Sequence, residues 1–116
     1  RGIVVKTFGL ADVLRNVLLP HSSAIEVAFV YGSVAKRNDR ADSDIDLFVV
    51  SENLSYQDLM KALETAESRL GRKINPTLHS RAELARKRAE GNSFVTRVLE
   101  QAKIFIIGAE HDLAKP

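Results

Sequence analysis

Residues 29–50 read FVYGSVAKRNDRADSDIDLFVV, and this stretch decides the fold. Apolar residues precede Gly32-Ser33 and return from Ile45 to Val50, which predicts a strand, a turn, a polar loop and a second strand. Asp44 and Asp46 lie two residues apart, a spacing that places both carboxylates on one face of a strand. Two like charges this close are unfavourable unless a cation lies between them. The stretch therefore predicts a metal site.

The composition is that of an ordinary globular domain. The sequence has 116 residues, of which 45% are hydrophobic and 28% are charged, and this length suits one domain with one core. It has no cysteine, so disulfides and thiolate metal sites are excluded. Its apolar runs are too short to span a bilayer and its first residues lack a signal-peptide pattern. These features favour a cytoplasmic protein without a membrane segment.

The net charge of +2 is unevenly distributed. Residues 1–58 hold six Lys and Arg against eight Asp and Glu, whereas residues 59–116 hold eleven against seven. A basic second half would suit a polyphosphate or a nucleic acid. Solvated faces of amphipathic helices explain the same charges and are the favoured interpretation.

One helix is predicted before this stretch. Apolar residues recur at helical spacing from Gly9 until Pro20 ends the pattern; they are Leu10, Val13, Leu14, Val17 and Leu18. Residues 1–6 are short and apolar, and they suit either a strand or the tail of an earlier element. Residues 21–23 are expected to form a loop before the first strand.

The segment that follows the first turn is expected to contain a short helix from residue 34 and a polar loop over residues 38–43. After the second strand, Ser55 is expected to cap a helix that stops at Gly71. Residues 73–79 predict a third strand. Pro76 removes a backbone donor there, which predicts an edge or bulged position.

The C-terminal part predicts two helices and a strand. Ser80 and Glu83 form a capping-box pattern that opens a helix reaching about residue 90. Gly91 and Asn92 interrupt it, and Ser93 is expected to cap the next helix. The last expected elements are a strand over residues 103–107, buried on both sides, and a frayed polar end over residues 108–116.

Strands separated by helices predict an α/β or α+β domain with a mixed sheet of about four strands and helices packed against it. We expect a single domain over residues 1–116. The sequence begins at Arg1 without a methionine, so the domain is expected to be part of a longer chain or an incomplete record of one.

A Gly-Ser turn followed after ten residues by an Asp-Ile-Asp strand resembles the signature of the polymerase β-like nucleotidyltransferase superfamily. The short length resembles its minimal nucleotidyltransferase group. The resemblance implies transfer of a nucleoside monophosphate, with AMP from ATP the first expectation, to an unknown acceptor. It also implies a Mg²⁺ or Mn²⁺ cofactor held by Asp44 and Asp46.

The same residues make physical sense for such a reaction. Two carboxylates suit Mg²⁺, which prefers oxygen ligands and bridges phosphates. Gly32 allows the backbone to approach a phosphate, and the Ser33 hydroxyl is a phosphate donor. Three cations in the loop are candidates for the triphosphate, with a solvated loop as the alternative; they are Lys36, Arg37 and Arg40.

The third carboxylate of the family pattern is not found where the resemblance places it, on the strand over residues 73–79. Asn75 and Thr77 stand there instead, and neither carries a charge or acts as a general base near neutral pH. His79 is a candidate assistant, although a packed or surface histidine is the favoured interpretation. The other candidate acids are Glu26, Asp42 and Asp58, and none of them matches the family position.

Two functions therefore stay open, an active enzyme and a catalytically impaired nucleotide-binding or regulatory domain. The resemblance also implies partners, either a helical protein of a toxin–antitoxin pair or an attached DNA-binding domain at the N-terminus. Because one small domain cannot enclose an acceptor, we expect a second subunit, such as another copy of the chain, or a further domain to complete the site.

Overall fold

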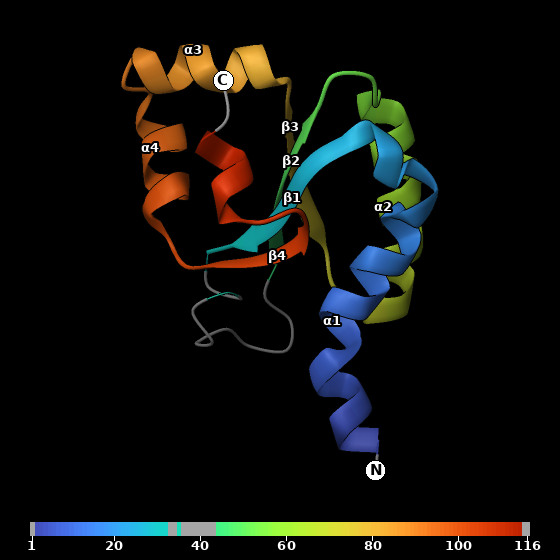
Figure 1. Cartoon of the computed structure of the whole chain (residues 1–116). Coiled ribbons are helices and arrows are strands. Elements are labelled where there is room, and N and C mark those ends of the chain that lie inside the picture. The colour runs from blue at the N-terminus through green and yellow to red at the C-terminus, as the bar shows by residue number, and fades with distance from the viewer. Residues whose placement is uncertain (1, 33–34, 36–43, 115–116) are drawn as a thin grey trace.

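The computed structural model describes residues 2–32, 35 and 44–114. In Figure 1 the chain forms a central sheet with helices on both sides. The elements are α1 (Gly2–Leu18), the 3-10 helix η1 (Leu19–Ala24), β1 (Ile25–Tyr31), β2 (Ile45–Ser51), α2 (Tyr56–Leu70), β3 (Ile74–His79), α3 (Arg81–Ala89), α4 (Ser93–Glu100), β4 (Lys103–Ile107) and the 3-10 helix η2 (Glu110–Ala114). The short helix and the polar loop expected between Gly32 and Asp44 lie outside the described residues.

The sheet has four strands in the order β3-β2-β1-β4. β1 is antiparallel to β2 and to β4, whereas β2 and β3 are parallel. The α/β (α+β) fold with a mixed four-stranded sheet is therefore confirmed. β3 lies at the edge, as Pro76 predicted, because a proline there removes no hydrogen bond that a neighbouring strand needs.

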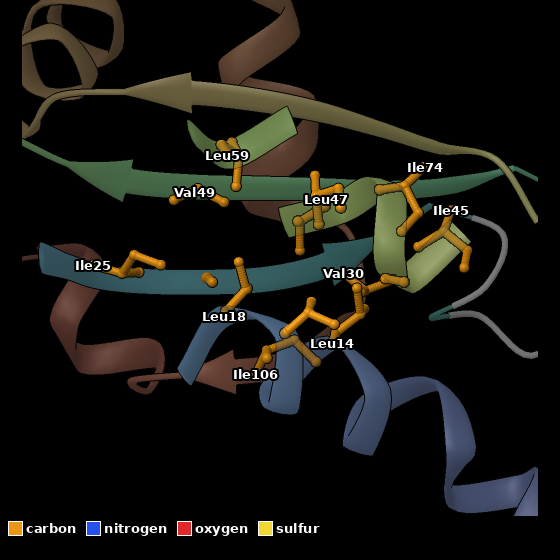
Figure 2. Close-up of a cluster of buried hydrophobic side chains, with 14 of the residues drawn as sticks. Leu14, Leu18, Ile25, Val30, Ile45, Leu47, Val49, Leu59, Ile74 and Ile106 are labelled. Carbon is orange, nitrogen blue, oxygen red and sulfur yellow. The ribbon is translucent and has the colours of Figure 1, made fainter. Parts of the chain in front are cut away.

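Each face of the sheet carries its own core. On one face, α1 and α2 cover a cluster that includes Leu14, Leu47 and Leu59 (Figure 2). On the other face, α3, α4 and η2 cover Phe29, Phe48 and the residues packed around them. Alternation along β1 and β2 sends successive side chains to these two cores. The sheet is thus the middle of three layers.

Most helix ends follow the predicted capping chemistry. The Ser55 hydroxyl accepts from the Asp58 amide, and Gly71 ends α2 with a φ of 65°. Ser80 and Glu83 form the complete capping box of α3. One cap was predicted wrongly, since the Asn92 side chain, not Ser93, accepts from the Val95 amide. Asn92 keeps a non-helical backbone, and its amide oxygen reaches the third residue of the helix.

Near both ends the described residues form helices that the sequence did not predict. Residues 2–6, left open between a strand and the tail of an earlier element, belong to α1, and residues 21–23, expected to form a loop, belong to η1. Within the end that was predicted to be frayed, residues 110–114 form η2, in which Leu113 is buried and its carbonyl accepts from Arg88. The interpretation of β4 as buried on both sides is wrong. β4 is an edge strand, and Ile106 is its one buried residue.

Over the parts of the chain given above, the structure contains no helix that is both long and apolar enough to cross a membrane.

Candidate functional site

Asp44 and Asp46 stand at the start of β2. Asp46 is the second residue of the strand, and Asp44 comes immediately before it. Asp46 has the same parity as Phe48 and Val50, so it lies on the sheet face that α3 and α4 cover. Asp44 is exposed and Asp46 is half-buried. A cation can therefore reach both carboxylates from solvent.

Gly32 follows β1 directly and faces the Asp46 side chain. Its φ of +80° is one that residues with a side chain rarely adopt. A Cβ atom added to Gly32 would lie 2.8 Å from Asp46 Oδ2. The absence of a side chain at Gly32 is thus what allows the carboxylate to lie against the turn.

Asn75 joins the two aspartates. In the parallel pairing of β2 and β3, Asn75 lies directly beside Asp46. Its side-chain nitrogen donates to Asp44 Oδ2 at 3.2 Å. Because that donor is the NH₂ group of the amide, the amide oxygen keeps its lone pairs for another ligand. The position expected to hold a third acid therefore holds a neutral group that touches the first acid.

Tyr31 lies beside Asp46 and continues the row of polar residues that Asn75 and Asp46 form across the sheet. It pairs with Asp46 on one side and with Lys103 on the other. Burial raises the pKa of the Tyr31 hydroxyl, with a smaller effect of the same sign from Asp46, while a hydrogen bond with Thr77 acts in the opposite direction. The phenol therefore stays neutral at physiological pH and connects β1 to β3 across β2.

Sequence reasoning missed Tyr31 and Lys103. The Lys103 side chain is almost fully buried, and its ammonium donates to the carbonyls of Leu99 and Gln101 at the end of α4. A tyrosine closing an otherwise apolar strand was a usable signal, because a buried hydroxyl needs a partner. The sequence gives a weaker indication for Lys103, because its position beside Tyr31 depends on β4 pairing with β1.

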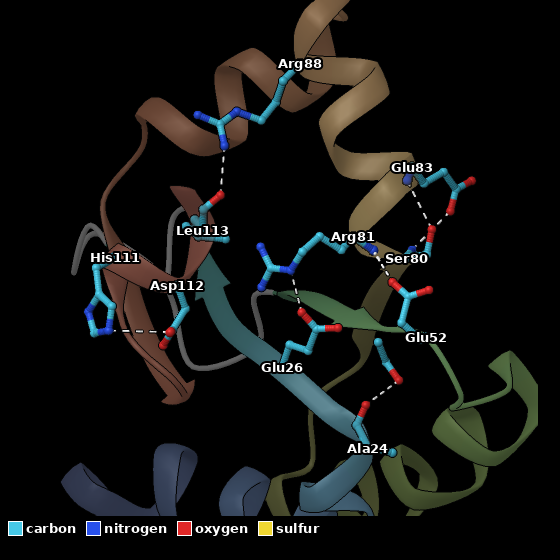
Figure 3. A network of polar contacts seen from close by, with 11 residues as sticks. Ala24, Glu26, Glu52, Ser80, Arg81, Glu83, Arg88, His111, Asp112 and Leu113 are labelled. Carbon is cyan, nitrogen blue, oxygen red and sulfur yellow. Dashed lines mark hydrogen bonds and ion pairs between the residues drawn. The ribbon is translucent and has the colours of Figure 1, made fainter. Parts of the chain in front are cut away.

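Several sequence candidates lie elsewhere. Glu26, at the opposite end of β1 from Tyr31, forms an ion pair with Arg81 (Figure 3). Asp58 lies in the first turn of α2. His79 ends β3, at the other end of that strand from Asn75, and stacks edge-on against Phe48. Ser33, Lys36, Arg37, Arg40 and Asp42 lie outside the described residues.

The oxygen atoms of this site match the ligand preference of Mg²⁺. Two carboxylates and a neighbouring amide oxygen are the hard oxygen ligands that this ion prefers, and they leave positions for water and phosphate oxygens. Within residues 2–32, 35 and 44–114, no group of three or more His, Cys, Asp or Glu side chains is placed to hold a metal. Asp44, Asp46 and Asn75 thus offer oxygen ligands of the kind that Mg²⁺ takes.

A comparison with known protein families identifies the family of this chain. The family model described as "Polymerase beta, Nucleotidyltransferase" matches residues 15–106. The chain therefore belongs to the polymerase β nucleotidyltransferase family, and the predicted resemblance is confirmed. A comparison with curated proteins finds no match.

Two solved structures have the same fold. One is a toxin–antitoxin with AMP-PNP, with 17% identity and a TM-score of 0.63. The other is a mutant of the toxin–antitoxin MntA–HpeT in which two aspartates, two positions apart, are glutamates, with 13% identity and a TM-score of 0.64. Both similarities cover 90% of this chain and 77% of the other. At this identity they establish the fold.

Proposed function

We propose that this domain is a Mg²⁺-dependent nucleotidyltransferase that moves AMP from ATP to an acceptor hydroxyl or phosphate. The observation that supports it is the Asp46 carboxylate lying against Gly32 with Asp44 beside it, in a chain of this family. The structural neighbour with AMP-PNP supports ATP as the nucleotide.

The proposed roles follow the chemistry of each residue. Asp44 and Asp46 hold the divalent ion, either Mg²⁺ or Mn²⁺, which when bound neutralises phosphate charge. Gly32 and Ser33 receive phosphate oxygens at the turn. The cations proposed to contact the triphosphate are Lys36, Arg37 and Arg40.

In the proposed reaction an acceptor oxygen forms a bond to the α-phosphorus of ATP. The bond from that phosphorus to the bridging oxygen of the leaving group breaks, and pyrophosphate departs with the electron pair. The acceptor proton passes to water or to a base. The chain's own contribution is to hold the nucleotide so that attack and departure are in line.

A second candidate is nucleotide binding with little or no turnover. Asn75 favours it, because the amide beside Asp46 cannot take a proton from the acceptor as a carboxylate can. In that case the domain acts as a regulatory or sensing module. The metal and nucleotide site is the same in both candidates, so the difference lies in catalysis.

We also propose that residues 1–116 form one domain that works in the cytoplasm with a protein partner. The two structural neighbours are toxin–antitoxin assemblies, which supports a partner that completes the acceptor side of the site. A helical partner protein, an attached DNA-binding domain or a second copy of the chain would each serve. A strictly monomeric chain with full activity would contradict this part of the proposal.

A turnover assay separates the two candidates. The chain is incubated with ATP labelled in the α-phosphate, Mg²⁺, and candidate acceptors that include partner proteins. The enzyme predicts release of pyrophosphate with label in the acceptor, lost in Asp44→Ala and Asp46→Ala. Nucleotide binding without labelled product, against every acceptor tried, would instead support the regulatory domain.

A further inference from the structure

The Tyr31 ring is held firmly on the sheet face that carries Asp46. Tyr31 is buried, and three aromatic rings pack edge-on against its phenol. Their centroids lie 6.0 to 6.5 Å from that of Tyr31, at interplanar angles of 62 to 73°; they belong to Phe29, Phe48 and Phe94. Edge-on pairs at this separation are favourable. Packing therefore fixes the direction in which the phenol points.

The Tyr31 hydroxyl reaches across β2 to β3. It forms a hydrogen bond with the Thr77 side chain. Tyr31 pairs with Asp46, whereas Thr77 pairs with Phe48, two residues further along β2. Since residues paired across strands share a face of the sheet, the phenol crosses β2 between Asp46 and Phe48. We call this contact the Tyr31–Thr77 bridge.

The bridge closes one side of the Asp46 side chain. Directly opposed residues of an antiparallel pair have Cβ atoms about 4.5–5.5 Å apart, so the phenol leaves β1 next to Asp46. On the other side, Asp46 Oδ2 lies close to Gly32, where an added Cβ would be 2.8 Å away. The carboxylate therefore lies between the bridge and the turn, at the end of β2 next to Asp44.

A simpler interpretation is that Thr77 only satisfies a buried hydroxyl, which would stabilise the fold without affecting Asp46. The course of the bridge favours a further role. An aspartate side chain has several staggered rotamers to choose from, and Asp46 is only half-buried. The bridge occupies the space along β2 toward Phe48, so a carboxylate directed there would meet the phenol.

We propose that Tyr31 and Thr77 are positioning residues that keep the Asp46 carboxylate directed toward the turn, where it can hold the divalent ion. The proposal rests on the nucleotidyltransferase function proposed above and adds to it two residues that act through Asp46. Replacing groups that orient metal ligands typically lowers metal affinity by about 10- to 100-fold. Because both hydroxyls are neutral, the bridge orients Asp46 without adding a charge to the site.

The side-chain torsion χ1 of Asp46 is the most direct readout, and it requires neither ion nor nucleotide. Three-bond couplings are measured by NMR in the isotope-labelled chain. We expect one rotamer in the original chain and averaged couplings in Tyr31→Phe and in Thr77→Val, each of which removes the bridge at nearly constant shape. Thr77→Ser retains the hydroxyl and should keep one rotamer. Averaged couplings in the original chain, or the same single rotamer in both variants without the bridge, would overturn the proposal.

Binding of Mn²⁺ measures the consequence for the site. Free Mn²⁺ is followed by electron paramagnetic resonance as the ion is added to the chain with AMP-PNP. We expect Tyr31→Phe and Thr77→Val each to weaken Mn²⁺ binding by about tenfold. The double variant should bind no more weakly than either single variant, because both changes remove the same bridge.

Val50→Ala is the matched control, because Val50 is buried on the same face of β2 and away from Asp46. It should lower the free energy of unfolding and leave Mn²⁺ affinity unchanged. Equal Mn²⁺ affinity in the original chain and in both variants without the bridge would contradict the proposal. A loss of affinity in Val50→Ala as large as theirs would also contradict it, since the loss would then follow from destabilisation.

The two readouts separate this proposal from the proposed function. An original chain that binds no Mn²⁺, but whose fixed Asp46 rotamer is released in both variants, would contradict the nucleotidyltransferase proposal and support the action of the bridge on Asp46. Mn²⁺ and nucleotide binding that is equally tight in the original chain and in both variants would do the reverse.

Discussion

Replacement of Gly32 by alanine should damage the site more than it damages the fold. The new Cβ would lie 2.8 Å from Asp46 Oδ2, whereas ordinary contact begins at 3.4 Å. The carboxylate must therefore move by about 0.6 Å or the turn must open. Metal–ligand distances in proteins lie within about 0.2 Å of their usual values, so a shift of this size disturbs the proposed site. We expect Gly32→Ala to weaken binding of ATP with Mg²⁺ by about tenfold or more, equivalent to about 1.4 kcal/mol.

The backbone cost must be separated from this effect. A side chain at a φ of +80° costs about 1–2 kcal/mol of stability. Gly71→Ala is the matched control, because Gly71 has a φ of +65° and an added Cβ would meet nothing within 4 Å. Both variants should lower the free energy of unfolding by a similar amount, which chemical denaturation measures. Calorimetric titration should show weaker nucleotide binding in Gly32→Ala alone.

Two results would refute this reasoning. If Gly32→Ala binds the nucleotide as tightly as the original chain, the position of the Asp46 carboxylate against the turn has no role in binding. If Gly71→Ala loses the same affinity, the loss follows from general destabilisation and not from the displaced carboxylate.

Three further predictions concern single side chains. Asn75→Asp places a third carboxylate beside Asp46, so the melting temperature without Mg²⁺ should be lower than that of the original chain, and Mg²⁺ should raise it by more. An equal rise in melting temperature in the two proteins would contradict the proposed ligand set. Burial raises the Tyr31 pKa above its ordinary 10.0, so the contribution of the neutral phenol to stability is complete below pH 10.0 and is lost as the pH rises through the raised pKa. Tyr31→Phe should therefore reduce the fall in the free energy of unfolding between about pH 9 and 11, measured by urea denaturation, and an identical fall in both proteins would contradict this prediction. Gly9→Ala, within α1 and with nothing within 4 Å of an added Cβ, should stabilise the chain by about 0.5–1 kcal/mol, and an unchanged or lower melting temperature would count against it.

Much of the fold could be predicted from local sequence patterns. The strands on either side of Gly32 and the caps at Ser55 and Ser80 were predictable because each depends on residues a few positions apart. The missing donor of Pro76 is an equally local signal, and it predicted an edge or a bulged position for that strand.

The errors came where contacts distant in sequence decide the outcome. The C-terminal end reads as polar, yet Leu113 is buried against α3, α4 and the sheet. The composition of β4 predicts a strand buried on both sides, but the sheet order leaves it at the edge. The row that joins Asn75, Asp46 and Tyr31 exists only once three strands pair in a particular register. Neither composition nor periodicity specifies that register.

The central proposal is that Asp44 and Asp46 bind a divalent ion together with a nucleotide. Calorimetric titration of the chain with ATP, in the presence and absence of Mg²⁺, tests it most directly, with Asp46→Asn as the comparison because it removes one charge at nearly constant shape. The account predicts binding that requires Mg²⁺ and is lost in Asp46→Asn. Absent binding, or equally tight binding without Mg²⁺ or in Asp46→Asn, would contradict it.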